Sequence, residues 1–184
     1  MFLLTEREAQ TISDCVDAVS NVAGDIVEIG VFEGGSAELI CQKKEKKTLH
    51  LFDTWEGIVA TAEEDLKTHS KFNIGRYSAK LEPVKEKLSQ YSNVKFYKGE
   101  FPKTYENNID KISLLHIDVD LYKPTKDAIR LLWNKLQIGG IMILHDYPSF
   151  EGVRMAVDEE LVNKQFIKIP ITKEQTIIIK YGKS

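Results

Sequence analysis

Hydrophobic and polar residues follow two different rhythms along the chain. Over residues 5–22 the apolar positions recur at helical spacing, which predicts an amphipathic helix. One face of that helix carries Ile12, Cys15, Val16 and Val19. Thr5 and Glu8 have the spacing of a capping box at its start. The next segment, DIVEIGV around Gly30, is a short β-branched apolar run, which is typical of a buried strand.

This change from helical to strand pattern repeats to the end of the chain. Further strands are predicted at residues 48–54, 93–99, 112–120, 139–147, 166–171 and 176–181. Helices are predicted at residues 34–44, 125–137 and 150–164, with two more within 60–91, the second around 77–91. Pro124 is expected to end the segment before the 125–137 helix, and Gly139 and Gly140 to lie just past its end.

The order of the elements predicts the sheet. Apolar strands that alternate with helices indicate a parallel sheet covered on both faces. The last two strands are separated only by residues 172–175, too few for a parallel crossover, so the last strand should run antiparallel. We therefore expect an α/β fold, a seven-stranded doubly wound and mostly parallel sheet with an antiparallel last strand, as in Rossmann-like class I methyltransferases. We expect one domain over 1–184, with an N-terminal helix in 1–22 and the core in 25–184.

Composition narrows the class of protein. The 184 residues are 42% hydrophobic and 29% charged, the balance of a globular domain. Two cysteines 26 positions apart, Cys15 and Cys41, fit neither a metal knuckle nor a redox pair. A net charge of −3 disfavours a nucleic-acid partner. No apolar run approaches a membrane span, and the start lacks the basic and long apolar regions of a signal peptide. We therefore expect a cytoplasmic protein without a membrane partner.

The first strand ends in a glycine turn, VEIGVFEGGSA, where ligands of such sheets bind. Gly30, Gly34, Gly35 and Ser36 form the turn and the start of the next helix, whose free N–H groups attract anions. A P-loop would need Lys before the serine, and a dinucleotide motif would need a second glycine where a phenylalanine stands. Glu28 suits a cofactor with a cationic ammonium, as in S-adenosylmethionine. The alternative is a structural glycine turn beside a surface acid.

The ends of the second and third strands supply further candidates for cofactor binding. Asp53, 23 residues after Gly30, is placed to bind ribose hydroxyls, with a helix cap as the alternative. Trp55 is a candidate for the wall of the same pocket, or for packing on the sheet edge. Glu100 is a candidate partner of the adenine amino group, and Phe101 a candidate for flanking the ring.

The fourth and fifth strands end in acidic residues. Asp118 and Asp120 should face the same side of an extended strand. His145 and Asp146 end the neighbouring strand, and they can converge only if that strand end turns or bulges. Like charges at a strand mouth call for a cation or a shared proton, so we predict a divalent-metal site. The alternatives are a helix cap for Asp120 and a hydrogen-bonded core histidine for His145.

Five segments together resemble the macrocin O-methyltransferase (TylF) family. They are VEIGVFEGGSA, FDTWEGI, YKGEFPKTYEN, LLHIDVDLYKPTKDAI and GGIMILHDY, within residues 24–157. The resemblance implies an enzyme that uses S-adenosylmethionine and a divalent metal to methylate sugar hydroxyls in natural-product biosynthesis. It implies that Asp118 and Asp146 hold the metal and that Asp120 is the general base.

One residue departs from the family pattern. Where the family has two aspartates at the end of the fifth strand, this chain has His145 and Asp146. An imidazole ligand favours Mn, Fe or Zn over Mg. We expect an O-methyltransferase acting on a small sugar or natural product, with a homodimer as one option for its assembly. The alternatives are a non-catalytic cofactor-binding protein with a decayed site and an NAD-dependent short dehydrogenase.

Overall fold

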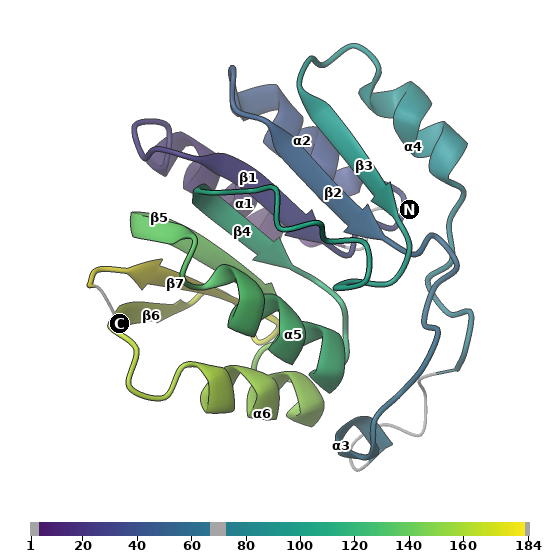
Figure 1. Cartoon of the computed structure of the whole chain (residues 1–184), viewed down its shortest axis with the longest axis vertical. Coiled ribbons are helices and arrows are strands. Elements are labelled where there is room, and N and C mark those ends of the chain that lie inside the picture. Colours follow the sequence, from purple (N-terminus) through teal and green to yellow (C-terminus); the bar gives the residue numbers. More distant parts are fainter. Residues whose placement is uncertain (1–3, 67–72, 183–184) are drawn as a thin grey trace.

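In the described residues, seven strands form one sheet in the order β3-β2-β1-β4-β5-β7-β6 (Figure 1). The computed structural model describes residues 4–66 and 73–182. The strands are β1 (Asp25–Ile29), β2 (Leu49–Asp53), β3 (Val94–Lys98), β4 (Ile112–Ile117), β5 (Leu136–His145), β6 (Phe166–Pro170) and β7 (Gln175–Lys180). The helices are α1 (Glu6–Ala18), α2 (Gly35–Lys43), α3 (Glu63–Leu66), α4 (Leu81–Leu88), α5 (Tyr122–Leu132) and α6 (Glu151–Glu160).

The pairing of the strands confirms the predicted fold. Strands β1 to β5 pair in parallel, and β7 pairs antiparallel with both β5 and β6. The short link between β6 and β7 forces this reversal, because a parallel connection would have to cross the sheet. The predicted capping box also forms: Thr5 caps α1, and its backbone N–H donates to Glu8 Oε2 at 2.9 Å.

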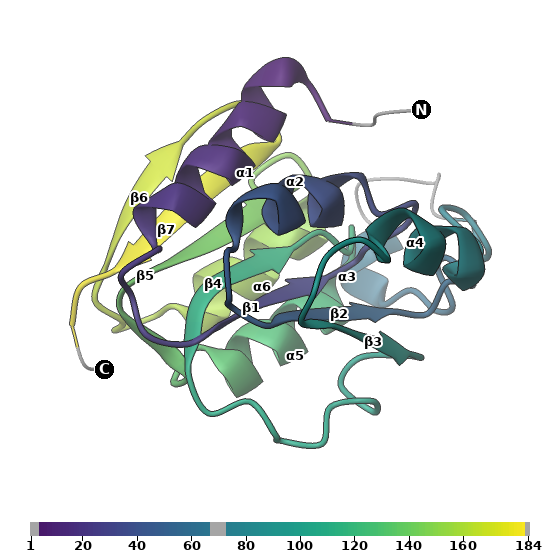
Figure 2. The ribbon, with the colours of Figure 1, turned by 90° about the horizontal axis from the view of Figure 1, so that it is seen from above.

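Two hydrophobic cores lie on opposite faces of the sheet. Helices α1, α2 and α4 cover one face, and α5 and α6 cover the other (Figure 2). Successive residues of β1 serve different cores: Ile26 packs toward α1 and α2, whereas Val27 and Ile29 pack toward α5. This alternation is expected of a strand buried on both faces.

The structure corrects the boundaries around α5 and β5. The helix begins at Tyr122 rather than Thr125, with Pro124 inside its first turn, where the missing N–H has no helical partner to lose. The next strand begins at Leu136, so Gly139 lies inside it rather than between elements. Gly139 has a φ of +81°, and the β4–β5 register shifts at this point. The glycine accommodates a bulge that the sequence pattern did not predict.

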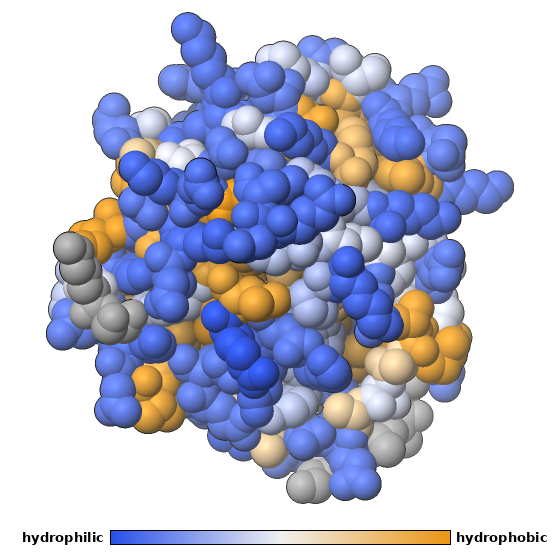
Figure 3. Space-filling model, in the orientation of Figure 1, coloured by the Kyte–Doolittle hydropathy of each residue, from blue (hydrophilic) through white to orange (hydrophobic). Residues whose placement is uncertain are grey.

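The segment between β2 and β3 holds two helices, as predicted, but both are short. Residues 67–72 lie outside the described part of the chain, so the prediction is tested only on either side of them. On the face seen in Figure 3, hydrophilic residues predominate and hydrophobic ones form separate small patches. Among the described residues, none of the helices has the length and apolar character needed to span a bilayer.

Candidate active site

A cavity of about 650 Å³ opens at the carboxyl ends of the strands. Its walls come from the segments that follow β1 to β5, as the switch-point rule for such sheets predicts. Most of the predicted site residues line it: Gly30, Gly35, Ser36, Asp53, Glu100, Phe101, Asp118, Asp120, His145 and Asp146. Glu28, Gly34 and Trp55 are not among its lining residues.

The glycine turn after β1 is shaped by close packing. Gly30 has a φ of +88°, and a Cβ there would lie 1.7 Å from the carbonyl oxygen of Asp118. Gly34 is the N-cap of α2 with a φ of +75°, and a Cβ there would lie 2.8 Å from Cγ1 of Val84 on α4. Gly34 therefore lets α2 and α4 approach one another, and it lies outside the cavity lining that Gly30 and Gly35 share.

The carboxylate of Asp53 holds this turn in place by hydrogen bonds. Its Oδ2 accepts the N–H groups of Val31 and Phe32 at 2.7 and 2.8 Å, and its Oδ1 accepts that of Trp55 at 2.6 Å. The carboxylate thus satisfies three backbone donors while still lining the cavity. The sequence pointed to Asp53 as a ligand for ribose but did not reveal this second role.

The structure places Trp55 outside the cavity lining. Its side chain is 4% exposed and packs in the core beside α2 and α4, tilted against Phe96. A φ of +53° at Trp55 turns the chain after β2, and the indole packs into that core, while Asp53 and Phe101 line the cavity. This is the sheet-edge packing that was the alternative.

Glu28 also lies away from the cavity surface. It is fully buried on the α2 face of β1, where Oε1 accepts a hydrogen bond from the Ser36 hydroxyl and lies 3.0 Å from Nδ1 of His116. The structure places the residue predicted to contact a cofactor ammonium beneath the cavity wall and not on it. Strand alternation explains the difference, because Ile26 and Glu28 share a face beneath the turn.

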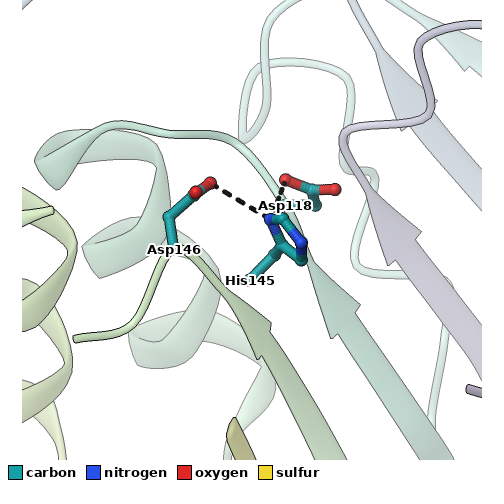
Figure 4. A group of neighbouring side chains, drawn as sticks. All are labelled: Asp118, His145 and Asp146. Atoms are coloured by element: carbon teal, nitrogen blue, oxygen red, sulfur yellow. Dashed lines mark ion pairs between the residues drawn. The ribbon is translucent and has the colours of Figure 1, made fainter. Parts of the chain in front are cut away.

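Asp118, His145 and Asp146 form a cluster at the ends of β4 and β5 (Figure 4). Nδ1 of His145 lies 3.4 Å from Oδ1 of Asp118 and 3.4 Å from Oδ2 of Asp146. One donor atom from each residue lies within 4.8 Å of the others. The strand ends at His145, and a φ of +60° at Asp146 turns the chain, which is the turn that convergence required.

The neighbouring groups of this cluster shift one another's pKa values. Burial lowers the pKa of His145, but the carboxylates of Asp118 and Asp146 outweigh it and raise that pKa to about 10. Burial and the neighbouring carboxylates raise the pKa of Asp118 and raise that of Asp120 well above its usual range. Acidic groups held this close favour a proton or a metal cation among them.

Asp120 differs from its expected setting. Strand β4 ends at Ile117, so Asp118 and Asp120 do not share an extended strand as predicted. A φ of +61° at Asp120 turns the chain, and its carboxyl hydrogen-bonds that of Asp146 at the cavity wall. The N-cap residue of α5 is Leu121, and the N–H of Tyr122 donates to Asp65 rather than to Asp120.

Sequence reasoning missed one wall of the cavity. Residues 57–62 and Asp65 line it, as does Tyr77, whose ring packs edge-on against Phe32. Burial and the charges of Asp120 and Asp146 raise the pKa of Tyr77, which places its hydroxyl in the field of the cluster. Gly57 and Ile58 end the FDTWEGI segment, but no pattern or motif in the sequence marked residues 59–62, Asp65 or Tyr77 as part of the cavity wall.

The family model for macrocin O-methyltransferase (TylF) matches residues 3–181. The chain belongs to this family. A demethyldecarbamoylnovobiocin O-methyltransferase from Streptomyces niveus is 30% identical over 169 residues, 83% of this chain and 64% of its own length. An 8-demethyl-8-(2,3-dimethoxy-alpha-L-rhamnosyl)-tetracenomycin-C 4'-O-methyltransferase from Streptomyces olivaceus is 28% identical over the same shares. This TylF-family chain thus spans slightly less than two thirds of the length of these curated relatives.

Solved structures agree with the fold of this TylF-family chain. The O-methyltransferase NovP superposes with a TM-score of 0.84 at 27% identity, over 96% of this chain and 80% of NovP. The calicheamicin methyltransferase CalS11 superposes with a TM-score of 0.80 at 18% identity, over 95% and 79% of the two chains. At that identity the second likeness bears on the fold alone.

Proposed function

We propose that this protein is an S-adenosylmethionine-dependent O-methyltransferase that acts on a hydroxyl of a sugar or another small natural product. The observation that carries the proposal is one cavity with two chemically different ends, in a chain of the TylF family. We call the part of the cavity that is lined by the glycine turn, Glu100 and Phe101 its first end, the cofactor end, and the part that is lined by Asp118, Asp120, His145 and Asp146 its second end, the acceptor end.

The first end suits the cofactor. S-adenosylmethionine would supply an electrophilic methyl group on a sulfonium. The free N–H groups at Gly35 and Ser36 would bind its carboxylate, since they begin helix α2 and line the cavity. Asp53 would accept the ribose hydroxyls, and Phe101 would flank the adenine. Glu28, the residue predicted to contact the ammonium, is buried beneath the turn.

The second end suits a divalent metal ion. Asp118, His145 and Asp146 would hold it, because they offer two carboxylate oxygens and one imidazole nitrogen within 4.8 Å of one another. A mixed set of carboxylates and imidazole favours Mn, Fe or Zn over Mg. A bound divalent ion lowers the pKa of a hydroxyl that it contacts.

Asp120 is the proposed general base. Its carboxyl lines the cavity beside the cluster and hydrogen-bonds that of Asp146, so it would lie next to an acceptor hydroxyl held by the metal ion. The walls of the cavity would hold the acceptor in line with the methyl group, which supplies most of the acceleration in such a displacement. The two alternatives have less support. The glycine turn lacks the second glycine of a dinucleotide motif, which disfavours an NAD-dependent dehydrogenase. A non-catalytic protein with a decayed site would not need three ligand-type side chains this close together.

A methyl-transfer assay tests the proposal. Purified protein would be mixed with S-adenosylmethionine, Mn²⁺ and a panel of acceptors that includes demethyldecarbamoylnovobiocin and rhamnosylated polyketides, and S-adenosylhomocysteine would be measured. We expect turnover of at least one acceptor. The Asp120→Asn variant should lower kcat by roughly 10²–10⁴-fold and change cofactor affinity less than about twofold. Cofactor binding without turnover across the panel would instead favour the non-catalytic alternative.

A further inference from the structure

The missed wall of the cavity is held in place by one buried carboxylate. Asp65 lies in the short helix α3 and is 2% exposed. Its Oδ2 accepts the N–H of Ala62 at 2.8 Å, at the end of the loop formed by residues 57–62. Its Oδ1 accepts the N–H of Tyr122 at 2.7 Å, 57 residues farther along the chain. One side chain therefore joins the loop to the start of α5.

Helix α5 needs this carboxylate. Its own N-cap residue is Leu121, which provides no side-chain hydrogen bond to the free N–H groups of the first turn. Asp65 supplies the missing acceptor from outside the helix, and its negative charge lies at the positive end of the helix dipole. The start of α5 is fixed only two residues after Asp120.

A third element is shaped to fit the same side chain. Gly152, in the first turn of α6, is buried, and a Cβ there would lie 2.4 Å from Oδ1 of Asp65 and 3.2 Å from Cβ of Tyr122. Its φ is not in the left-handed region, so the backbone does not require glycine. Glycine is required there because Asp65 occupies the space that a Cβ would take. Figure 1 shows α3 beyond the sheet, beside the ends of α5 and α6.

The other end of the loop is tied down separately. The N–H of Ile58 donates to the carbonyl of Arg76 at 2.9 Å, and the N–H of Gly75 donates to the carbonyl of Ile58 at 2.8 Å. Residues 57–62 all line the cavity between this tie and Asp65. Release of Asp65 would therefore free one end of the wall and leave the other attached.

We propose that Asp65 is a positioning residue that closes loop 57–62 over the acceptor end of the cavity and fixes the turn that carries Asp120. This inference rests on the proposed function for its meaning in catalysis, but the contact itself is independent of it. Because Asp65 accepts hydrogen bonds from Ala62 and Tyr122 and not from the proposed cofactor contacts at Gly35 and Asp53, its loss should affect the acceptor end and spare the cofactor end.

Hydrogen exchange tests the contact. In Asp65→Ala, the amides of residues 57–62 and 120–123 should exchange about tenfold faster or more, while those of β1 and β4 keep their protection. Asp65→Asn keeps one acceptor oxygen and should give an intermediate effect. Glu63→Ala removes an exposed carboxylate from the same helix and should leave both segments unchanged. Gly152→Ala displaces Asp65 without removing it, so it provides a second route should Asp65→Ala fail to fold.

Turnover and cofactor binding separate positioning from general stability. For the acceptor turned over in the methyl-transfer assay, Asp65→Ala should lower kcat/KM by about 10–100-fold, with a higher acceptor KM. The Kd for S-adenosylhomocysteine should change less than about twofold. Unchanged hydrogen exchange at Tyr122 in both Asp65→Ala and Gly152→Ala would show that Asp65 does not hold the start of α5. Altered exchange with an unchanged kcat/KM would show that Asp65 is not a positioning residue. Altered exchange in the variants, together with no turnover by the native protein, would support the contact made by Asp65 and count against the proposed function.

Discussion

At the scale of single residues, His145 has the most unusual setting in the site. The carboxylates of Asp118 and Asp146, each 3.4 Å from its Nδ1, raise its pKa to about 10 despite burial. At pH 7 the imidazole therefore carries a proton, and it must lose that proton before it can bind a metal ion. A proton and a metal ion compete for the same place between the two carboxylates.

The first prediction concerns this competition. Mn²⁺ affinity, measured by calorimetry in several buffers, should rise about tenfold per pH unit between about pH 6.5 and 9, because each bound ion displaces one proton from His145. The sign follows from the raised pKa: the proton is held below about 10 and is lost only above it. A histidine with its ordinary pKa of about 6.5 would give a flat profile over most of this range.

His145→Asp is the matched control, because it restores the residue of the family pattern. Its carboxyl titrates near about 4 in the absence of neighbours, so the slope above pH 6.5 should be smaller than in the native protein. The preference should also shift toward Mg²⁺, the harder ion. Equal slopes and an equal ion preference in the two proteins would show that His145 does not bind the ion.

The residues at strand ends were predictable from sequence to different degrees. The pattern of apolar strands followed by polar residues placed Asp53, Asp118 and His145 at one edge of the sheet, and all three line the cavity. It could not place Glu28, because a strand buried on both faces has no polar face to reveal where each side chain points. Asp65 could not be found either, since its partner Tyr122 is set by tertiary packing.

At the scale of elements, the ends of β1 and β4 are pressed together at Gly30. The backbone N–H of Asp118 donates to the carbonyl of Ile29 at 2.9 Å, which brings the Asp118 carbonyl over the Cα of Gly30. The glycine turn and the acidic turn are therefore one mechanical unit. A side chain at Gly30 would separate the proposed cofactor end of the cavity from the metal end.

The second prediction compares two glycines with similar positive φ angles. Gly30 and Gly75 have φ values of +88° and +83°, but a Cβ at Gly75 meets nothing within 4 Å in the described part of the chain. Gly75→Ala should cost about 1–2 kcal/mol of unfolding free energy, from backbone strain alone. Gly30→Ala adds a contact of 1.7 Å with backbone, so it should cost more than about 4 kcal/mol or prevent folding. Similar losses in urea denaturation would contradict this close approach.

The order of the elements was more predictable than their ends. Alternating apolar patterns predicted all seven strands, and the short link before β7 predicted its reversal. The start of β5 was missed because Gly139 reads as a helix stop, whereas its positive φ serves a bulge within the strand. Local sequence cannot distinguish these two uses of glycine, since the choice depends on the register with β4.

At the scale of the whole molecule, the cavity exists only when the sheet is folded, because its walls follow five different strands. The cavity lies where strands from both halves of the sheet end, and its lining residues come from the segments after β1, β2, β3, β4 and β5. A ligand in the cavity binds the folded chain and not the unfolded one. Binding therefore raises the free energy of unfolding, by an amount that depends on the ratio of ligand concentration to Kd.

The last prediction uses this linkage to discriminate between cofactors. S-adenosylhomocysteine at about 100 times its Kd should add about 2.7 kcal/mol to the free energy of unfolding. For a chain of this size, that corresponds to a rise of roughly 5–10 °C in Tm by calorimetry. NAD at the same concentration should leave Tm within about 1 °C, because the glycine turn has Phe32 where a dinucleotide motif needs its second glycine. Asp53→Asn is the informative variant: it keeps the shape of the side chain but weakens the acceptor for ribose, so the rise with S-adenosylhomocysteine should shrink. A rise with NAD that equals the rise with S-adenosylhomocysteine would overturn the assignment of the cavity to a methyl donor.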